Sequence, residues 1–199
     1  MKHLLPILVS LLIPAFTLEA QSVPSGLTKA DILAFSARIA SIESDFVQVK
    51  ESSLLAAPAV SSGHMTYRRP GYLVWDYREP LPFTFIADGD RVTLRRAGQD
   101  ETPGGNQGRM LKEMMHVIIG HIDGSILSDE KLFKATYEQT GSGLVVTLLP
   151  QKKDIRKMWS KFVLFYEPDS MHVDKFEMHE PSGDLTTITF SNTQYGFSE

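Results

Sequence analysis

The stretch GHMTYRRPGYLVWDY, residues 63–77, decides the fold, because it contains two short strands joined by a tight turn. Residues 63–68 and 71–77 are the strands, and Arg69-Pro70-Gly71 between them is a strong turn signal. Alternate residues of the second strand are apolar and lie on one face. We therefore predict an antiparallel hairpin with one buried face.

The same pattern of short strands and turns continues on both sides of this hairpin. Strands are predicted at 46–50, 81–87 and 90–95, separated by turns that contain proline or Asp-Gly. Such short connections favour an antiparallel meander. After a long middle section the strands return, and the candidates there are residues 144–149, 161–166, 173–179 and 185–191.

Helices are predicted in three places. Thr28 can cap a first helix over residues 28–40, because apolar residues from Ile32 through Ile39 to Ile42 recur at helical spacing. After a glycine-rich loop, residues 109–121 predict a helix that is apolar around most of its circumference. A short helix is expected at 129–136. Residues 151–160 are ambiguous between one helical turn and an irregular crossing.

This order of elements predicts an α+β protein that is mainly antiparallel β. A strongly curved sheet with helices across its concave face would leave a slot lined by apolar side chains, which can serve as a ligand cavity. Met110, Met114 and Met115 fall on the central helix, and methionines adapt to variable apolar partners. On composition alone, ordinary core packing explains these methionines better than a cavity.

The N-terminus has the pattern of a secretory signal peptide. Lys2 precedes an apolar run at 4–16, and cleavage is expected between Ala20 and Gln21. An uncleaved anchor is the alternative. If the signal peptide is cleaved, residues 21–199 form a single domain. The sequence has no cysteine, which excludes disulfides, a thiol nucleophile and lipid attachment through cysteine, and its net charge of −4 argues against nucleic-acid binding.

Signals for catalysis are weak. Glu113 and His116 stand three apart on the central helix, but His121 is about 140° further around it, which does not make a zinc site. Gly141-Ser142-Gly143 precedes a strand, so it lacks the strand-to-helix context of a nucleophile elbow. The glycines at 104–108 favour a flexible loop over a phosphate cradle. We expect no catalytic residue, no metal and no cofactor.

The opening stretch resembles the LolA family of periplasmic outer-membrane lipoprotein carriers. That family shows an Arg-Pro pair, then an apolar residue and a tryptophan, which here are Arg69-Pro70, Leu73 and Trp75. The resemblance extends over residues 33–191. Its further matches are Phe46-x-Gln48, Gly63, Asp88-Gly89 and Leu148-Leu149-Pro150.

The resemblance implies an incomplete, half-open β-barrel, with an N-terminal helix and lid helices covering a hydrophobic cavity. It implies that Arg69 holds the lid closed through hydrogen bonds. Two departures from the family are Leu73, where phenylalanine is common, and a final strand that we expect to be short or missing. With the apolar residues already noted, the cavity-lining set is Phe46, Met65, Tyr67, Leu73, Trp75, Phe83, Phe85, Met110, Met114, Met115 and Ile118.

The function implied is transport of lipoproteins through the periplasm. The expected partners are lipoprotein acyl chains or another lipid, an inner-membrane transporter and an outer-membrane acceptor, with the carrier acting as a monomer. Two alternatives remain open. One is a periplasmic sensor or regulatory module with the same half-barrel fold, and the other, less favoured, is a hydrolase that acts on lipids.

Overall fold

The computed structural model describes residues 26–167 and 171–198. The predicted signal peptide at residues 1–20 lies outside these ranges. Within them, no helix is long and apolar enough to cross a membrane.

One antiparallel sheet of 11 strands dominates the described residues, and its neighbours run in the order β6-β5-β4-β3-β2-β1-β11-β10-β9-β8-β7. Its centre is β1 (Ile39–Glu51), paired with β2 (Ala59–Arg68) and β11 (Leu185–Phe197). The two wings do not meet, so the barrel stays open, and the predicted α+β half-barrel is confirmed. One wing consists of β3 (Tyr72–Glu79), β4 (Phe83–Asp88), β5 (Arg91–Arg96) and β6 (Gln99–Glu101). The other wing consists of β7 (Phe133–Thr140), β8 (Gly143–Pro150), β9 (Lys161–Tyr166) and β10 (Val173–His179).

Helix α1 (Lys29–Arg38) begins at the predicted cap. The Thr28 backbone N–H donates to Asp31 Oδ2 at 2.9 Å, and the Asp31 N–H donates to Thr28 Oγ1 at 3.3 Å. The helix is shorter than predicted, because Ile39 and Ile42 belong to β1 instead. Both isoleucines are buried there, and pairing with two neighbouring strands outweighs their helical spacing.

The middle of the chain holds α2 (Gly105–Ile122), which begins four residues before the predicted start. It is followed by α3 (Ser125–Ser128). The helix predicted at 129–136 is wrong, because residues from Phe133 onward form β7 and pair with β8 along its whole length. The ambiguous segment contains α4 (Lys153–Met158). The final strand also differs from expectation, since β11 runs to Phe197 beside β1.

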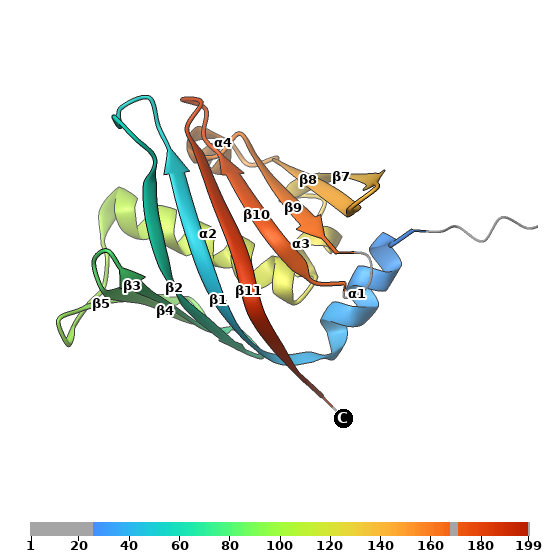
Figure 1. The fold of residues 1–199 in the computed structure, drawn as a ribbon, viewed down its shortest axis with the longest axis horizontal. Coiled ribbons are helices and arrows are strands. Elements are labelled where there is room, and N and C mark those ends of the chain that lie inside the picture. The colour runs from blue at the N-terminus through green and yellow to red at the C-terminus, as the bar shows by residue number, and fades with distance from the viewer. Residues whose placement is uncertain (1–25, 168–170, 199) are drawn as a thin grey trace, which may run out of the picture.

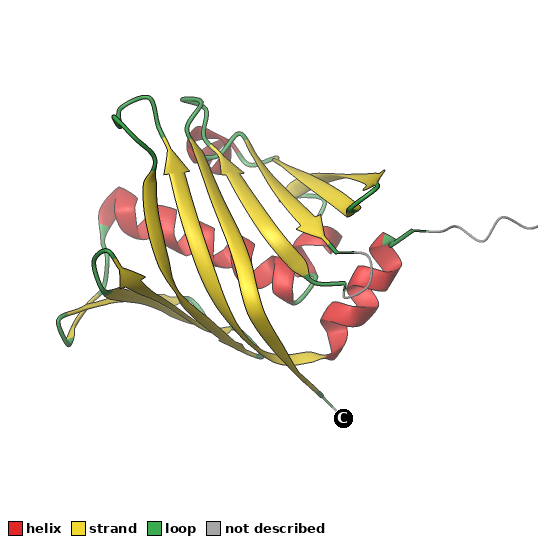
Figure 2. Ribbon diagram, in the orientation of Figure 1, coloured by secondary structure: helices red, strands yellow, loops and turns green. Residues whose placement is uncertain are grey.

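The sheet curls around α2, and the core lies between them. Figure 1 shows α2 crossing one face of the sheet, with α1 at the lower end and α4 near the upper turns. Figure 2 shows that α2 and α3 lie on the same face, and no helix of the described ranges covers the opposite face of the sheet. The fold therefore places α2 where the predicted lid should be.

Candidate functional site

A continuous apolar layer fills the space between the sheet and α2. Nearly all of the predicted cavity-lining residues belong to one hydrophobic cluster with this layer, while Met110 is the exception at 38 % exposed. Those in the cluster are Phe46, Met65, Tyr67, Leu73, Trp75, Phe83, Phe85, Met114, Met115 and Ile118. The structure thus brings together residues from four strands and one helix. Their role in holding a ligand stays a prediction.

Aromatic rings form the sheet side of this layer. The Phe46 ring packs against Trp75, with centroids 4.6 Å apart, and edge-on against Tyr77 at 5.2 Å. Tyr77 also stacks on Phe83 at 4.4 Å. The Tyr77 hydroxyl donates to Gln48 Oε1 at 2.7 Å, and burial raises its pKa to about 12, so it stays neutral. The surface offered toward α2 is therefore large, apolar and uncharged.

One close approach makes this arrangement possible. The Phe46 ring lies over Gly63 of β2, where an added Cβ would come within 2.7 Å of the ring and 2.0 Å of the Asp76 carbonyl oxygen. Only glycine fits at this point of the ladder, where β2 and β3 also shift register. Gly63 is thus needed for the ring of Phe46 to pack at this point inside the half-barrel.

The helical side of the layer comes from α2. Its buried residues recur at helical spacing, and Met114 lies partly buried at their edge. The helix starts at Gly104, which provides no side-chain cap for its free N–H groups. Its exposed face carries Lys112, which forms an exposed ion pair with Asp90 at 2.9 Å. The buried residues of this helix are Leu111, Met115, Val117, Ile118, Gly120 and Ile122.

Arg69 joins the β2–β3 turn to the end of α1. Its Nε donates to the carbonyl oxygen of Ile39 at 2.7 Å, and its Nη2 donates to that of Ser36 at 2.7 Å. Its backbone N–H donates to the Ala40 carbonyl at 2.9 Å. A guanidinium at a helix C-terminus satisfies carbonyls that lack helical partners and complements the helix dipole. Its side-chain partners are therefore at α1, and its predicted role in holding a lid is untested.

Helix α1 packs against the junction between α2 and α3. Gly124 has a positive φ of 80° there, and an added Cβ would meet Leu33 Cδ2 at 3.0 Å and Ser36 Cβ at 3.3 Å. The carbonyl of Ser36 is one of the two that Arg69 binds. A line of contacts thus runs from Arg69 through α1 to the end of α2.

Openings lie beside α2 near its N-terminal end and along its middle. A groove of about 450 Å³ lies beside its N-terminal end, lined by residues that include Met110 and Met158. A second hollow of about 290 Å³ shares those two methionines and extends to Trp159 and the β10–β11 turn. A smaller pocket of about 150 Å³ lies where Met115 faces the β4–β5 turn. These openings border the apolar layer.

The histidines of α2 lie in different surroundings. His116 is exposed, whereas His121 stacks near Phe176, with centroids 6.2 Å apart, and donates from Nδ1 to the Ile118 carbonyl at 3.0 Å. Burial lowers the pKa of His121 to about 4, so its ring is neutral at pH 7. Among the described residues, no group of three His, Asp or Glu side chains could hold a metal ion.

Some contributors to the site escaped sequence reasoning. The carbonyl acceptors of Ser36 and Ile39 and the packing partner Gly124 carry no residue-type signal, because backbone groups are present at every position. Gln48 was noted as a family match, but its role as the acceptor for Tyr77 was not predicted, although it lies two residues from Phe46 on the same strand face.

An open antiparallel sheet wrapped around a helix over an apolar layer defines the class of half-barrel proteins. The chain belongs to the LolA family, because the family profile for the outer membrane lipoprotein carrier protein LolA matches residues 37–197. An outer-membrane lipoprotein carrier protein from Methylobacillus flagellatus is 30 % identical over 137 residues, which are 66 % of this chain. The match spans 61 % of that relative's length. The family description names a carrier, not an enzyme.

Solved structures with similar backbones are more distant. A LolA superfamily protein from Nitrosomonas europaea has a TM-score of 0.46 and 10 % identity, covering 87 % of this chain and 96 % of that one. The MucA/MucB complex from Pseudomonas aeruginosa gives a TM-score of 0.45 and 14 % identity, covering 86 % and 57 % of the respective chains. At these TM-scores the fold assignment depends on the strand order and the family profile.

Proposed function

We propose that this protein carries lipoproteins, or a related acylated lipid, from the inner to the outer membrane through the periplasm. The observation that carries the proposal is the apolar layer between the concave face of the sheet and α2. The layer is rich in aromatic and methionine side chains, and openings near the N-terminal end and along the middle of α2 border it. Family membership supports the same role.

Acyl chains would take the place of α2 against the sheet. Each methylene that leaves water contributes about 0.8 kcal/mol, so a lipoprotein's acyl chains can displace a helix held by side-chain packing. Met114 and Met115 would remain in contact with the cargo as α2 moves outward, because methionine adapts to irregular apolar surfaces. Tyr77 stays uncharged inside the layer, and its hydroxyl is hydrogen-bonded to Gln48.

Arg69 would set the balance between loading and release. Its two hydrogen bonds hold α1 against the end of α2 in the packed form, and this stabilises the form without cargo. A carrier needs interactions that favour the form without cargo, because a cavity that binds acyl chains too tightly would not release them. Binding and release then proceed without a covalent step.

The path of the cargo belongs to the same proposal. After cleavage of residues 1–20, the carrier would act as a monomeric single domain that receives cargo from an inner-membrane transporter and delivers it to an outer-membrane acceptor. The family description, which names an outer-membrane lipoprotein carrier, supports this path.

A binding experiment tests the proposal. A synthetic peptide carrying a diacylglyceryl group and an amide-linked acyl chain should displace a fluorescent hydrophobic dye from the purified protein. The same peptide without acyl chains is the matched control and should displace none. If neither the dye nor the acylated peptide binds, or if both peptides behave alike, the carrier function is wrong.

A further inference from the structure

The β1–β2 hairpin ends in an exposed apolar tip that takes no part in the core. Residues 52–62 read SSLLAAPAVSS and contain no charged side chain. Leu54 is 91 % exposed, Leu55 45 % and Val60 56 %. Figure 1 shows this hairpin projecting at the top of the view. Leaving these aliphatic side chains in water is unfavourable, so the tip is a candidate contact surface.

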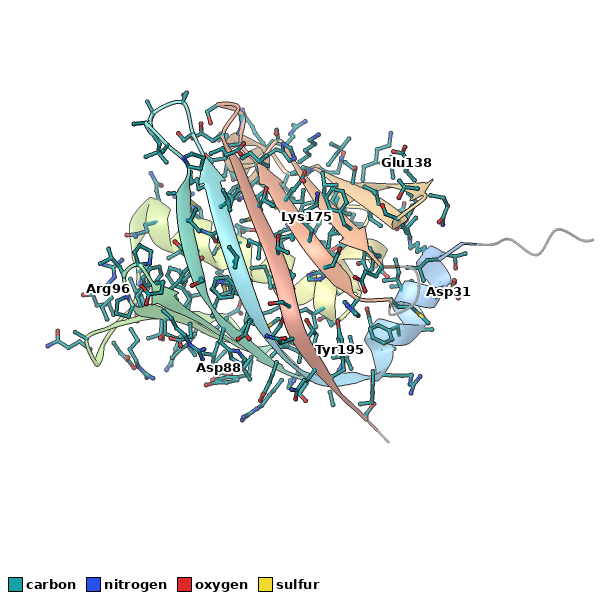
Figure 3. All side chains as sticks on the ribbon, in the orientation of Figure 1. Asp31, Asp88, Arg96, Glu138, Lys175 and Tyr195 are labelled. Atoms are coloured by element: carbon teal, nitrogen blue, oxygen red, sulfur yellow. The ribbon has the colours of Figure 1, made fainter. Side chains whose placement is uncertain are left out.

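A second apolar tip lies at the same end of the sheet. The β3–β4 turn carries Leu81, which is 72 % exposed, and β2–β3 pairing brings Ser62 beside Glu79 just before this turn. Arginines stand close to the turn in sequence and on the neighbouring strand: Arg78 ends 3.6 Å from Asp76, and Arg96 is the last residue of β5. Figure 3 shows Arg96 at this edge of the molecule, away from Asp88 at the other end of the β4–β5 pair.

The openings at the N-terminal end of α2 face the same end. The Lys50–Glu180 ion pair, 2.9 Å long, joins the base of the β1–β2 hairpin to the β10–β11 turn. Glu180 also lines the hollow that contains Met110 and Met158. The β1–β2 hairpin and the hollow of about 290 Å³ beside α2 therefore lie at the same end of the molecule.

We propose that this end of the molecule rests on a phospholipid bilayer, with Leu54 and Leu55 inserted at the level of the headgroups. The chemistry of the tip favours lipid over a protein partner. Protein interfaces depend on tryptophan, tyrosine and arginine anchors, and residues 52–62 contain none of these. Aliphatic side chains without charge partition into the interfacial layer of a bilayer. The inference goes beyond the proposed carrier function and does not require cargo.

A tryptophan reporter tests the insertion. The native Trp75 and Trp159 are buried, at 1 % and 6 % exposure, so a tryptophan placed at position 54 would be the solvent-exposed fluorophore. In Leu54→Trp, emission should shift to the blue when vesicles of phosphatidylethanolamine and phosphatidylglycerol are added, and lipids brominated near the headgroup should quench it. Val47→Trp, at a site 46 % exposed in the middle of β1, is the matched control and should not respond.

A charge substitution gives a second, independent measurement. Leu54→Glu should weaken co-sedimentation with the same vesicles by about tenfold, because burial of one leucine is worth at least that factor. Val47→Glu adds the same charge away from the tip and should bind as well as the native chain. The proposal is wrong if the variants at positions 47 and 54 respond equally to vesicles, or if neither responds. It is also wrong if position 54 responds only to vesicles that contain an embedded protein. If the protein fails to bind acylated peptide in the absence of vesicles, the carrier function is wrong, but the proposed contact with the bilayer is not affected.

Discussion

At the scale of single residues, Arg69 connects the β2–β3 turn to the end of α1. It bonds two carbonyls at the end of α1 with its side chain, and α1 packs on Gly124 next to α2. The Arg-Pro pair is visible in the sequence and indicates a special position. Its acceptors could not be predicted, because nothing in residues 36–39 marks their carbonyls as free until α1 is seen to end there.

Arg69→Leu should uncouple loading from release. The variant loses two charge-assisted hydrogen bonds, so the packed form without cargo becomes less stable. We expect it to accept acylated peptide normally and to transfer it to acceptor vesicles about tenfold more slowly, since partly exposed bonds of this kind contribute about 1 kcal/mol or more. Arg68→Leu is the matched control, because Arg68 is the exposed neighbour on β2. Equal transfer rates for the two variants would contradict the proposal that Arg69 stabilises the form without cargo.

Gly63→Ala should destabilise the fold strongly. The new methyl group would clash with a backbone carbonyl and with the Phe46 ring, so the β2–β3 ladder must shift. We expect a loss of about 2–4 kcal/mol in the free energy of unfolding, measured by urea titration. Gly141→Ala, where an added Cβ meets nothing within 4 Å, should change stability by less than about 0.5 kcal/mol. A similar small change in both variants would contradict the close packing.

His121 should make the protein less stable in mild acid. Its folded pKa of about 4 lies below the unfolded value of 6.5, so below pH 6.5 the unfolded chain takes up a proton that the folded chain refuses. The resulting loss is about 2 kcal/mol between pH 7 and pH 5. His121→Phe, which keeps a ring beside Phe176, should remove most of this pH dependence in thermal melts. If the thermal stability of the variant depends on pH as that of the native protein does, a group other than His121 causes the loss of stability in acid.

At the scale of elements, the strands were easier to predict than the helix ends. β9 and β10 match their predicted bounds, because each is a short run with buried apolar residues between clear turns. The segment after α3 misled the prediction, since residues 129–136 have both a cap-like serine before them and an apolar pair within. Pairing with β8 decides its conformation, and that pairing is a long-range contact that local spacing does not encode.

Helix α2 should open more easily than the sheet. It is held by side-chain packing and lacks a side-chain cap at Gly104, whereas β1 is hydrogen-bonded to strands on both sides. In hydrogen–deuterium exchange, amides of α2 should exchange at least about tenfold faster than those at the centre of β1. Uniform protection across both elements would mean that α2 does not move independently, and would argue against a lid.

At the scale of the whole molecule, two open wings of antiparallel strands meet at β1 and β11 and curl around α2. The apolar residues that face inward were predictable, because strand alternation and the family resemblance both indicate them. Met110 was grouped with them, yet it is 38 % exposed and lines the outer groove with Met158. Whether acyl chains enter between sheet and helix is a property of the opened form, which no sequence pattern describes.

Quenching of Trp75 by a labelled acyl chain tests the central claim most directly. Trp75 lies in the middle of the apolar layer, and Trp159→Phe would leave it as the single tryptophan of the chain. A lipopeptide with brominated acyl chains should quench its fluorescence saturably, with about one peptide bound per protein, while the non-brominated lipopeptide binds without quenching. Saturable binding of the brominated lipopeptide that leaves Trp75 fluorescence unchanged would place the cargo elsewhere and contradict the account.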